Sequence, residues 1–182
     1  MSRFATCPHC ADIAPTRRAV IAGLAAAALL PAAARAAPTA GDDERFMRIA
    51  IAEARRADFP FGAVIVRDGT ILARGRNLGR TTDDPTAHGE MVAIRRALKA
   101  HGSKALKGAT IYTSGEPCAM CMGAILWCGF GRMVFAASVE QLATKINQIM
   151  ISSADLAAKA PYAPISITGG VLADEAMKLF AK

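Results

Sequence analysis

Apolar residues recur along this chain with two different periods, and each period predicts a different kind of element. From Asp43 they return every three or four residues, as on one face of a helix. The β-branched run of residues 61–67 and the returning segment 70–76, separated by Asp68-Gly69, predict a β-hairpin. A second helical period covers residues 88–100, and four of its side chains are expected to face inward: Met91, Ile94, Ala97 and Leu98.

The rest of the chain continues this alternation of short apolar runs and helical periods. Strands are expected at residues 109–113, 132–136 and 164–168, and helices at 118–127, 138–159 and 172–180. Within the helix expected at 138–159, residues 148–153 are compatible with either a helix or a strand. The order α-β-β-α-β-α-β-α-β-α predicts an α/β protein, a three-layer α/β/α sandwich around a five-stranded mixed sheet.

The first 36 residues follow neither period. Arg17-Arg18 precede an apolar run that is too short to span a bilayer, and Ala34-Arg35-Ala36 has the form of a cleavage site. The paired arginines resemble a twin-arginine export signal without its usual lysine. The expected division of the chain is a signal peptide over residues 1–36, a linker over 37–42 and one domain over 43–182.

This interpretation places the mature protein in the periplasm, beginning at Ala37, with no stable membrane anchor. The alternative is an alanine-rich N-terminus without an address function, which leaves the protein in the cytoplasm. Twin-arginine export carries folded proteins, as the resemblance implies. A protein on this route can therefore fold and take up any cofactor before it crosses the membrane.

Charge changes this picture only slightly. The 182 residues are 53% hydrophobic and carry a formal net charge of +7. Four arginines and one aspartate lie in the first 36 residues, which leaves +4 for the remainder, and no block of five like charges occurs. A mildly basic surface accounts for this distribution, so a nucleic acid is a less favoured partner than a small molecule.

The five cysteines fall into two groups. Cys7 and Cys10 lie in the segment that we expect to be removed, and no strand precedes them as in a redox motif, so their role stays open. Without them, Cys118, Cys121 and Cys128 are too few for a disulfide framework.

Two short motifs carry the chemistry. The first, H-x-E, contains His88 and Glu90, and the second, P-C-x-x-C, contains Pro117, Cys118 and Cys121. A catalytic zinc takes three protein ligands and keeps its fourth position for a water whose pKa falls to about 7. His88, Cys118 and Cys121 are therefore the expected zinc ligands. Glu90 is expected beside that water, as the catalytic acid and base.

The spacing of the second motif suits metal binding. Pro117 is compatible with the first turn of a helix, and Cys118 and Cys121 then lie on one helix face. The helix N-terminus lowers the pKa of a thiol and so favours its metal-binding form. Either motif alone is as compatible with a structural or redox role as with metal binding. Both together, each in or before a helix-like segment that follows a strand, favour a zinc site.

These residues resemble the cytidine and deoxycytidylate deaminase superfamily from about Arg45 to Phe180, because H-x-E followed by P-C-x-x-C is the signature of zinc nucleobase deaminases. The resemblance implies a five-stranded sheet between helices, a homodimer or larger oligomer, and a proton-shuttling role for Glu90. The family commonly has alanine where this chain has Gly89. Near a helix start glycine costs little, so we expect activity to be retained.

Two branches of the superfamily are similar to this chain. The segments 84–88 and 116–118 occur in both bacterial guanine deaminases and tRNA adenosine deaminases, and Asn77 matches the asparagine that both place against the substrate. Phe61 and Trp127 lie in segments that look more like the guanine enzymes, whereas residues 169–175 look more like the tRNA enzymes. Core packing for the two aromatic residues and a turn for Asn77 are the alternative roles.

The expected function is therefore zinc-dependent hydrolytic deamination of a nucleobase or nucleoside, above all a purine such as guanine, with release of ammonia. The substrate contacts are assigned to Asn77, Phe61 and Trp127. The alternatives are a tRNA adenosine-to-inosine deaminase and a cytosine or cytidine deaminase. A non-catalytic zinc protein should lack an acid such as Glu90. The expected partners are a small purine or pyrimidine and a second copy of the chain.

Overall fold

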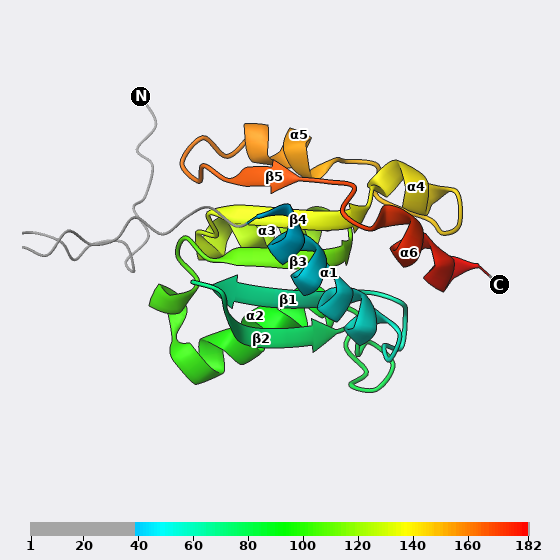
Figure 1. The fold of residues 1–182 in the computed structure, drawn as a ribbon, viewed down its shortest axis with the longest axis horizontal. Coiled ribbons are helices and arrows are strands. Elements are labelled where there is room, and N and C mark those ends of the chain that lie inside the picture. Colours follow the sequence, from blue (N-terminus) through cyan, green and yellow to red (C-terminus); the bar gives the residue numbers. More distant parts are fainter. Residues whose placement is uncertain (1–38, 182) are drawn as a thin grey trace, which may run out of the picture. The chain divides into compact units, whose positions relative to one another are not determined.

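A computed structural model describes residues 39–181. The predicted signal peptide, with Cys7 and Cys10, lies outside the described residues. The described part contains a five-stranded sheet in the order β2-β1-β3-β4-β5 (Figure 1). The strands are β1 (Gly62–Arg67), β2 (Thr70–Arg76), β3 (Thr110–Gly115), β4 (Arg132–Ala137) and β5 (Ser166–Thr168). The first three pair antiparallel, and β3, β4 and β5 run parallel, so the sheet is mixed as expected.

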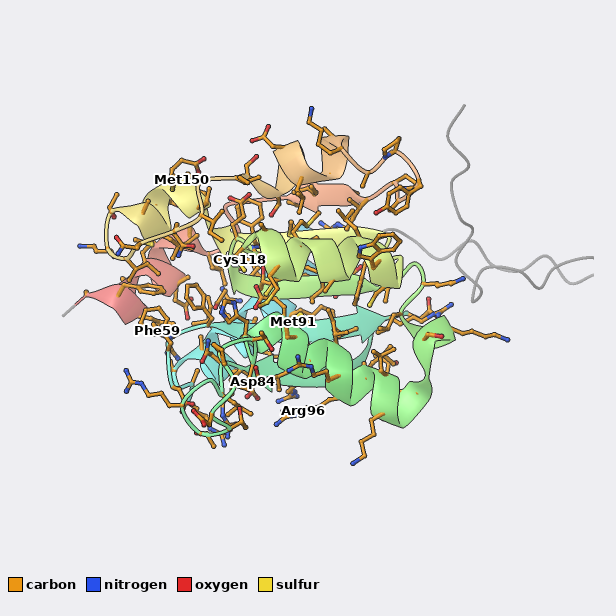
Figure 2. All side chains as sticks on the ribbon, turned by 180° about the vertical axis from the view of Figure 1, so that it is seen from behind. Phe59, Asp84, Met91, Arg96, Cys118 and Met150 are labelled. Carbon is orange, nitrogen blue, oxygen red and sulfur yellow. The ribbon has the colours of Figure 1, made fainter. Side chains whose placement is uncertain are left out.

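Helices cover both faces of this sheet. They are α1 (Ala40–Ala54), α2 (Gly89–His101), α3 (Ala119–Cys128), α4 (Val139–Ala143), α5 (Ser153–Ala158) and α6 (Ala173–Met177), with the 3₁₀ turns η1 (Ser103–Ala105) and η2 (Lys178–Phe180). Apolar residues of α1 and α6 pack on one face, and those of α2, α3 and α5 pack on the other (Figures 1 and 2). The predicted three-layer α/β/α sandwich is confirmed.

The hairpin forms where the sequence predicts it. Asp68 and Gly69 have φ of 54° and 74°, as both central residues of a type I′ turn require. On the adjoining strand, a Cβ at Gly75 would overlap the carbonyl oxygen of Gly89 and the backbone nitrogen of Ala93. Glycine at this position therefore lets the first turn of α2 lie directly against β2, which fixes where that helix begins.

Two element boundaries differ from the predictions. Helix α1 begins at Ala40, because Thr39 and Asp42 form a capping box, so the expected linker ends earlier than residue 42. The predicted helix over 138–159 is two short helices, since Ser138 and Ser152 each start a new one by accepting from an N–H three residues on. Residues 144–152 between them have no regular structure.

The inward face of α2 also differs from the prediction. Ala93, Ile94 and Ala97 are buried, but Leu98 is 37% exposed. Small residues form the centre of the buried stripe, because the helix approaches the sheet closely, and Leu98 lies to one side of it. No helix among the described residues is both long and apolar enough to cross a membrane.

Candidate active site

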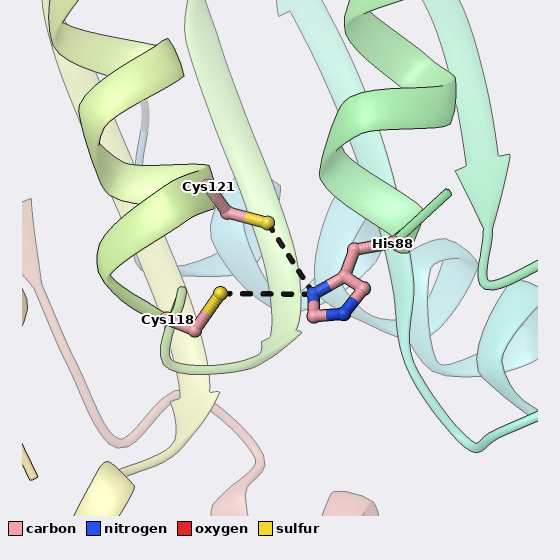
Figure 3. A group of neighbouring side chains, drawn as sticks. All are labelled: His88, Cys118 and Cys121. Atoms are coloured by element: carbon pink, nitrogen blue, oxygen red, sulfur yellow. Dashed lines mark hydrogen bonds between the residues drawn. The ribbon is translucent and has the colours of Figure 1, made fainter. Parts of the chain in front are cut away.

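Three side chains meet at the N-termini of two helices. His88 is the N-cap of α2, Cys118 is the N-cap of α3, and Cys121 lies in the first turn of α3 (Figure 3). Both sulfurs lie 3.6 Å from Nδ1 of His88, and the three donor atoms all lie within 4.8 Å of one another. The structure thus brings the three predicted ligands together, although His88 precedes the cysteines by 30 and 33 residues.

This arrangement fits a zinc ion. Zinc binds sulfur at about 2.3 Å and imidazole nitrogen at about 2.0–2.1 Å, so two such ligands at a tetrahedral angle are about 3.6 Å apart. The observed distances from sulfur to nitrogen have this value. One imidazole and two thiols are donors that zinc prefers, and three protein ligands leave a fourth position. His88, Cys118 and Cys121 therefore form a zinc site of the open, catalytic type.

The pKa values of the two thiols are shifted in opposite directions. A hydrogen bond from Cys121, aided by one from His88 and opposed by burial, lowers the pKa of Cys118 to about 4. The same hydrogen bond to Cys118, together with burial, raises the pKa of Cys121. The hydrogen bond with Cys118 also raises the pKa of His88. A thiol binds a metal as the thiolate, so the lowered pKa favours metal binding by Cys118, and the raised pKa of Cys121 opposes loss of its proton.

Glu90 lies in the first turn of α2, two residues after His88, and is 6% exposed. Burial raises the pKa of its carboxyl to about 7, and the negative charge of Cys118 adds to this shift. A group with a pKa near neutrality is present in both forms at the pH of the cell. It can therefore accept a proton and return one in a single catalytic cycle.

A pocket of about 430 Å³ opens on this cluster. Phe59 and Cys118, which are labelled in Figure 2, belong to its lining. The full lining is Phe59, Phe61, Asn77, His88, Glu90, Glu116, Cys118, Ile146, Asn147 and Gln148. The volume is that of a small-molecule site. The pocket thus joins the zinc ligands and Glu90 to two of the three predicted substrate residues, Asn77 and Phe61.

Asn77 has two roles in the structure. Its Oδ1 accepts the backbone N–H of Gly79 at 3.0 Å, which is the turn role considered as an alternative. The side chain is 8% exposed and lines the pocket. Because Oδ1 is oriented by the turn, the amide nitrogen is a donor that Asn77 can offer to a ligand.

Trp127 does not lie in this pocket, and its predicted placement is wrong. The side chain is 78% exposed and packs against Tyr162, with ring centroids 5.3 Å apart. Helix α3 starts at the zinc ligands and leads away from them, so nine residues of helix place Trp127 about 13 Å from Cys118 along the axis. The alternative role in the core is excluded by the same exposure.

The loop before His88 is fixed by a polar cluster that the sequence analysis missed. Oδ1 of Asp84 accepts the backbone N–H and the hydroxyl of Thr86, at 2.8 and 2.6 Å, and Oδ2 accepts from Arg95 at 3.1 Å. The hydrogen bonds from Thr86 hold the pKa of Asp84 below its usual range. Arg95 belongs to α2, so this cluster ties the loop to the helix that His88 begins.

The sequence analysis also did not predict three further parts of the pocket lining. Phe59 precedes the first strand, Glu116 was noted only as part of a motif, and residues 146–148 lie in the segment expected to be helical. The motif that contains Glu116 is the one signal that pointed to any of them. None of the others has a local pattern that marks it as a pocket residue.

Comparison with known proteins adds a family match. The sequence model for the cytidine and deoxycytidylate deaminase zinc-binding region matches residues 40–137, which include both motifs. A solved structure from a study of A-to-I editing by tRNA:A34 deaminases superposes with a TM-score of 0.64 at 32% identity. The match covers 74% of this chain and 98% of that one.

Two relatives with similar sequences act on different substrates, according to their names. A guanine deaminase of Bacillus subtilis is 53% identical over 78 residues, which are 43% of this chain and 50% of that protein. A tRNA-specific adenosine deaminase of Buchnera aphidicola is 35% identical over 146 residues, 76% of this chain and 86% of that protein. The chain thus spans only about half the length of the guanine deaminase that it matches.

Proposed function

Because the chain belongs to the cytidine and deoxycytidylate deaminase family, we propose that it hydrolyses the exocyclic amine of a free purine base, guanine above all, to a carbonyl and ammonia. One observation carries this proposal. Glu90, buried and with a pKa of about 7, lies in the same pocket as His88 and Cys118. An acid of that pKa beside an open metal site is what a hydrolytic deamination requires.

The chemistry divides between the metal and Glu90. His88, Cys118 and Cys121 would hold zinc, which would supply an activated water as the nucleophile for the carbon that bears the amine. The carboxylate of Glu90 takes a proton from the water and gives one to the adjacent ring nitrogen. A second proton then passes from the attacking oxygen through Glu90 to the amine nitrogen, which leaves as ammonia. The carbon–nitrogen bond breaks, a carbonyl forms, and Glu90 ends in its starting form.

The remaining lining orients the base. The amide nitrogen of Asn77 is available to donate to an acceptor on the ring, since its oxygen is already held by Gly79. Phe59 and Phe61 pack on each other with ring centroids 5.6 Å apart and both line the pocket. Their rings offer an apolar surface to a flat base. A base held by these contacts would present its reacting carbon to Glu90, which lines the same pocket.

The lining favours a free base over a nucleic acid. None of the described residues that line the pocket is Lys or Arg. A tRNA needs cationic side chains along its phosphates, whereas an uncharged base does not. The exposed position of Trp127 removes one argument for guanine that the sequence offered. The proposal therefore depends on the uncharged lining and on Phe59 and Phe61.

The second candidate is adenosine in a tRNA anticodon. It is favoured by the tRNA-specific adenosine deaminase, since the match to that relative extends over 86% of its length. A cytosine or cytidine substrate would use the same zinc site and Glu90. The three candidates differ in the size and charge of what must enter the pocket.

Ammonia release tests these candidates with purified, zinc-loaded protein. The panel contains guanine, adenine, cytosine, cytidine and an anticodon stem-loop with adenosine at the wobble position. We expect guanine to react fastest, with little change as salt rises. Faster reaction of the stem-loop, falling steeply with salt, would establish the tRNA candidate instead. Zinc-loaded Glu90→Gln protein, run in parallel, excludes ammonia from contaminating enzymes.

The chain is also proposed to act as a homodimer. Helix α3 contains no charged residue, yet Met120 and Trp127 are 37% and 78% exposed on its outer side. A helix that is apolar all round is normally covered. Light scattering is expected to give twice the mass of one chain, and Trp127→Glu to give the monomer. A monomeric wild type at micromolar concentration would contradict this assembly.

Export to the periplasm is the last part of the proposal, and it depends on the arginine pair of the leader. Fractionation of the native host is expected to find mature protein that begins at Ala37 outside the inner membrane. Replacing Arg17 and Arg18 by lysine is expected to retain the protein in the cytoplasm. Full-length protein in the cytoplasm of unmodified cells would refute export and strengthen the tRNA candidate.

A further inference from the structure

One wall of the pocket is a segment without regular structure. Residues 144–152 connect α4 to α5, and Ile146, Asn147 and Gln148 from this segment line the pocket. Three of its other side chains, Ile149, Met150 and Ile151, are 58%, 58% and 42% exposed. We call residues 144–152 the pocket wall. A segment of this kind keeps one position only if its ends are held.

The two helices that flank the pocket wall, α4 and α5, both start at the same carboxylate. Oε2 of Glu116 accepts the backbone N–H of Val139 at 2.9 Å, and Oε1 accepts that of Ser153 at 2.7 Å. These are the first N–H groups of α4 and α5, which have no partner within their helices. Glu116 is 8% exposed, so both hydrogen bonds are shielded from water.

The two helices do not need Glu116 in order to start. Ser138 accepts the N–H of Gln141, and Ser152 accepts the N–H of Asp155, so each helix has a cap of its own. The hydrogen bonds of Glu116 are therefore additional to the local caps. What they add is position, because they tie both helix starts to a residue 23 and 37 positions earlier in the chain.

Glu116 is itself fixed next to the metal site. Its backbone N–H donates to the carbonyl of Ala137 at 2.7 Å, which continues the pairing of β3 with β4. Only Pro117 separates it from the zinc ligand Cys118. The hydroxyl of Ser153 also approaches the carbonyl of Pro117, at 3.5 Å. A short and rigid piece of chain thus connects a zinc ligand to both anchors of the pocket wall.

We propose that Glu116 is a positioning residue that couples the zinc site to the pocket wall, so that metal loading orders residues 144–152 and thereby completes the substrate pocket. This inference deepens the proposed function, since it concerns the same pocket. It assigns Glu116 no contact with the reacting atoms. Its effect passes through Val139 and Ser153 to the wall, which contacts the substrate.

Trypsin cleavage after Lys145, which is exposed in the pocket wall, measures the order of the wall without any substrate. Zinc is expected to slow this cleavage in the wild type. In Glu116→Gln one of the two N–H groups faces an amide NH₂, so the cleavage is expected to be about tenfold faster and independent of zinc. Cleavage after Lys107, outside the wall, serves as the internal reference.

Three further measurements separate positioning from simple loss of stability. Glu116→Gln should keep its zinc and the tetrahedral absorption spectrum of a cobalt(II)-substituted site. Its loss in deamination should fall on KM rather than on kcat, because the wall contacts the substrate in the ground and transition states alike. Glu140→Gln, the same change at an exposed residue of α4, should behave as wild type in every assay.

Ser153→Pro gives a second variant in case Glu116→Gln does not fold. Proline is favoured at the first position of a helix, and it removes one N–H donor to Glu116 while leaving the carboxylate in place. The same rise in cleavage after Lys145 is expected. Equal cleavage of the variant and the wild type, or a zinc effect that persists in the variant, would overturn the coupling. A chain that deaminates none of the bases but gives the expected cleavage removes the proposed function and leaves this inference standing.

Discussion

Two buried polar clusters lie on opposite faces of the sheet, and they satisfy their charges in opposite ways. On the α1 face, Asp43 accepts from Arg132 at 2.6 and 2.7 Å and from the hydroxyl of Tyr112 at 2.9 Å. On the other face, Glu90 lies beside the imidazole and the two thiols of the zinc site. The first is called the structural cluster and the second the metal cluster.

Their acids respond to burial differently. Burial alone would raise the pKa of Asp43. The hydrogen bonds from Arg132 and Tyr112 outweigh this effect, so the pKa of the carboxyl is lower than its usual range. For Glu90 burial outweighs the hydrogen bonds from its backbone and Cys121, and it raises the pKa to about 7. A buried acid with a full set of partners is fixed in one form and holds elements together. A buried acid whose partners do not outweigh burial keeps two forms available for chemistry, at a cost in stability.

The largest expected effect comes from removing a metal ligand. Cys118→Ala should lose zinc and, with it, all measurable deamination, because two remaining ligands hold the ion poorly. Metal analysis and ammonia release measure both losses. Cys128→Ala changes a thiol outside the metal cluster and should keep both properties. Retention of zinc and turnover by Cys118→Ala would show that the metal cluster has been wrongly assigned.

Removing the acid of the metal cluster should separate chemistry from stability. Glu90→Gln is expected to retain one zinc per chain and to lose turnover by at least about 10²-fold, as general acid–base catalysis requires. Its free energy of unfolding should not fall, because an uncharged amide replaces a buried ionisable group. Urea unfolding and kcat measure the two quantities. Unchanged turnover in the zinc-replete variant is the result that excludes the mechanism.

The matching change in the structural cluster should have the reverse effect. Asp43→Asn leaves Arg132 without its carboxylate and should destabilise the fold by about 3 kcal/mol. The kcat of the folded, zinc-loaded protein should stay the same. Glu44→Gln, on the same helix but in an exposed pair with Arg48, should cost less than about 0.5 kcal/mol. If Asp43→Asn and Glu44→Gln had equal free energies of unfolding, the structural role assigned to Asp43 would be wrong.

The smallest expected effect is on the pH dependence of stability. The folded pKa of Asp43 is lowered, so its ionisation stabilises the fold above the unfolded pKa of about 3.9. This contribution is lost as the pH falls through the folded pKa. The difference in unfolding free energy between wild type and Asp43→Asn should therefore narrow from about pH 5 to about pH 3. A constant difference over that range would contradict the lowered pKa.

The metal cluster was accessible from the sequence because its signals are local. His88, Glu90, Cys118 and Cys121 lie in short motifs whose spacing reflects helix geometry and zinc coordination, and the structure brings all four together. The strands and the hairpin at Asp68-Gly69 were predicted for the same reason. Periodicity and turn chemistry act over a few residues, so one sequence suffices to detect them.

The structural cluster and the anchors of the pocket wall depend on contacts between distant residues. Asp43 marks the start of a helical period in the sequence, but its partner Arg132 is 89 residues away. Glu116 binds an N–H 37 residues further on. Trp127 was misplaced because a motif gives its distance along the chain but not the direction of its helix. Such pairings arise from tertiary packing, which no local pattern records.

The pocket wall also bears on how new substrate preferences can arise. Residues 144–152 contribute no strand and no zinc ligand, and both flanking helices are anchored to one carboxylate. Surface segments with fixed ends accept changes in sequence and length at a small entropic cost. A combinatorial library over these positions that keeps Glu116, Ser138 and Ser152 therefore varies the recognition surface while the catalytic machinery is inherited intact. Duplicated genes can diverge by the same route.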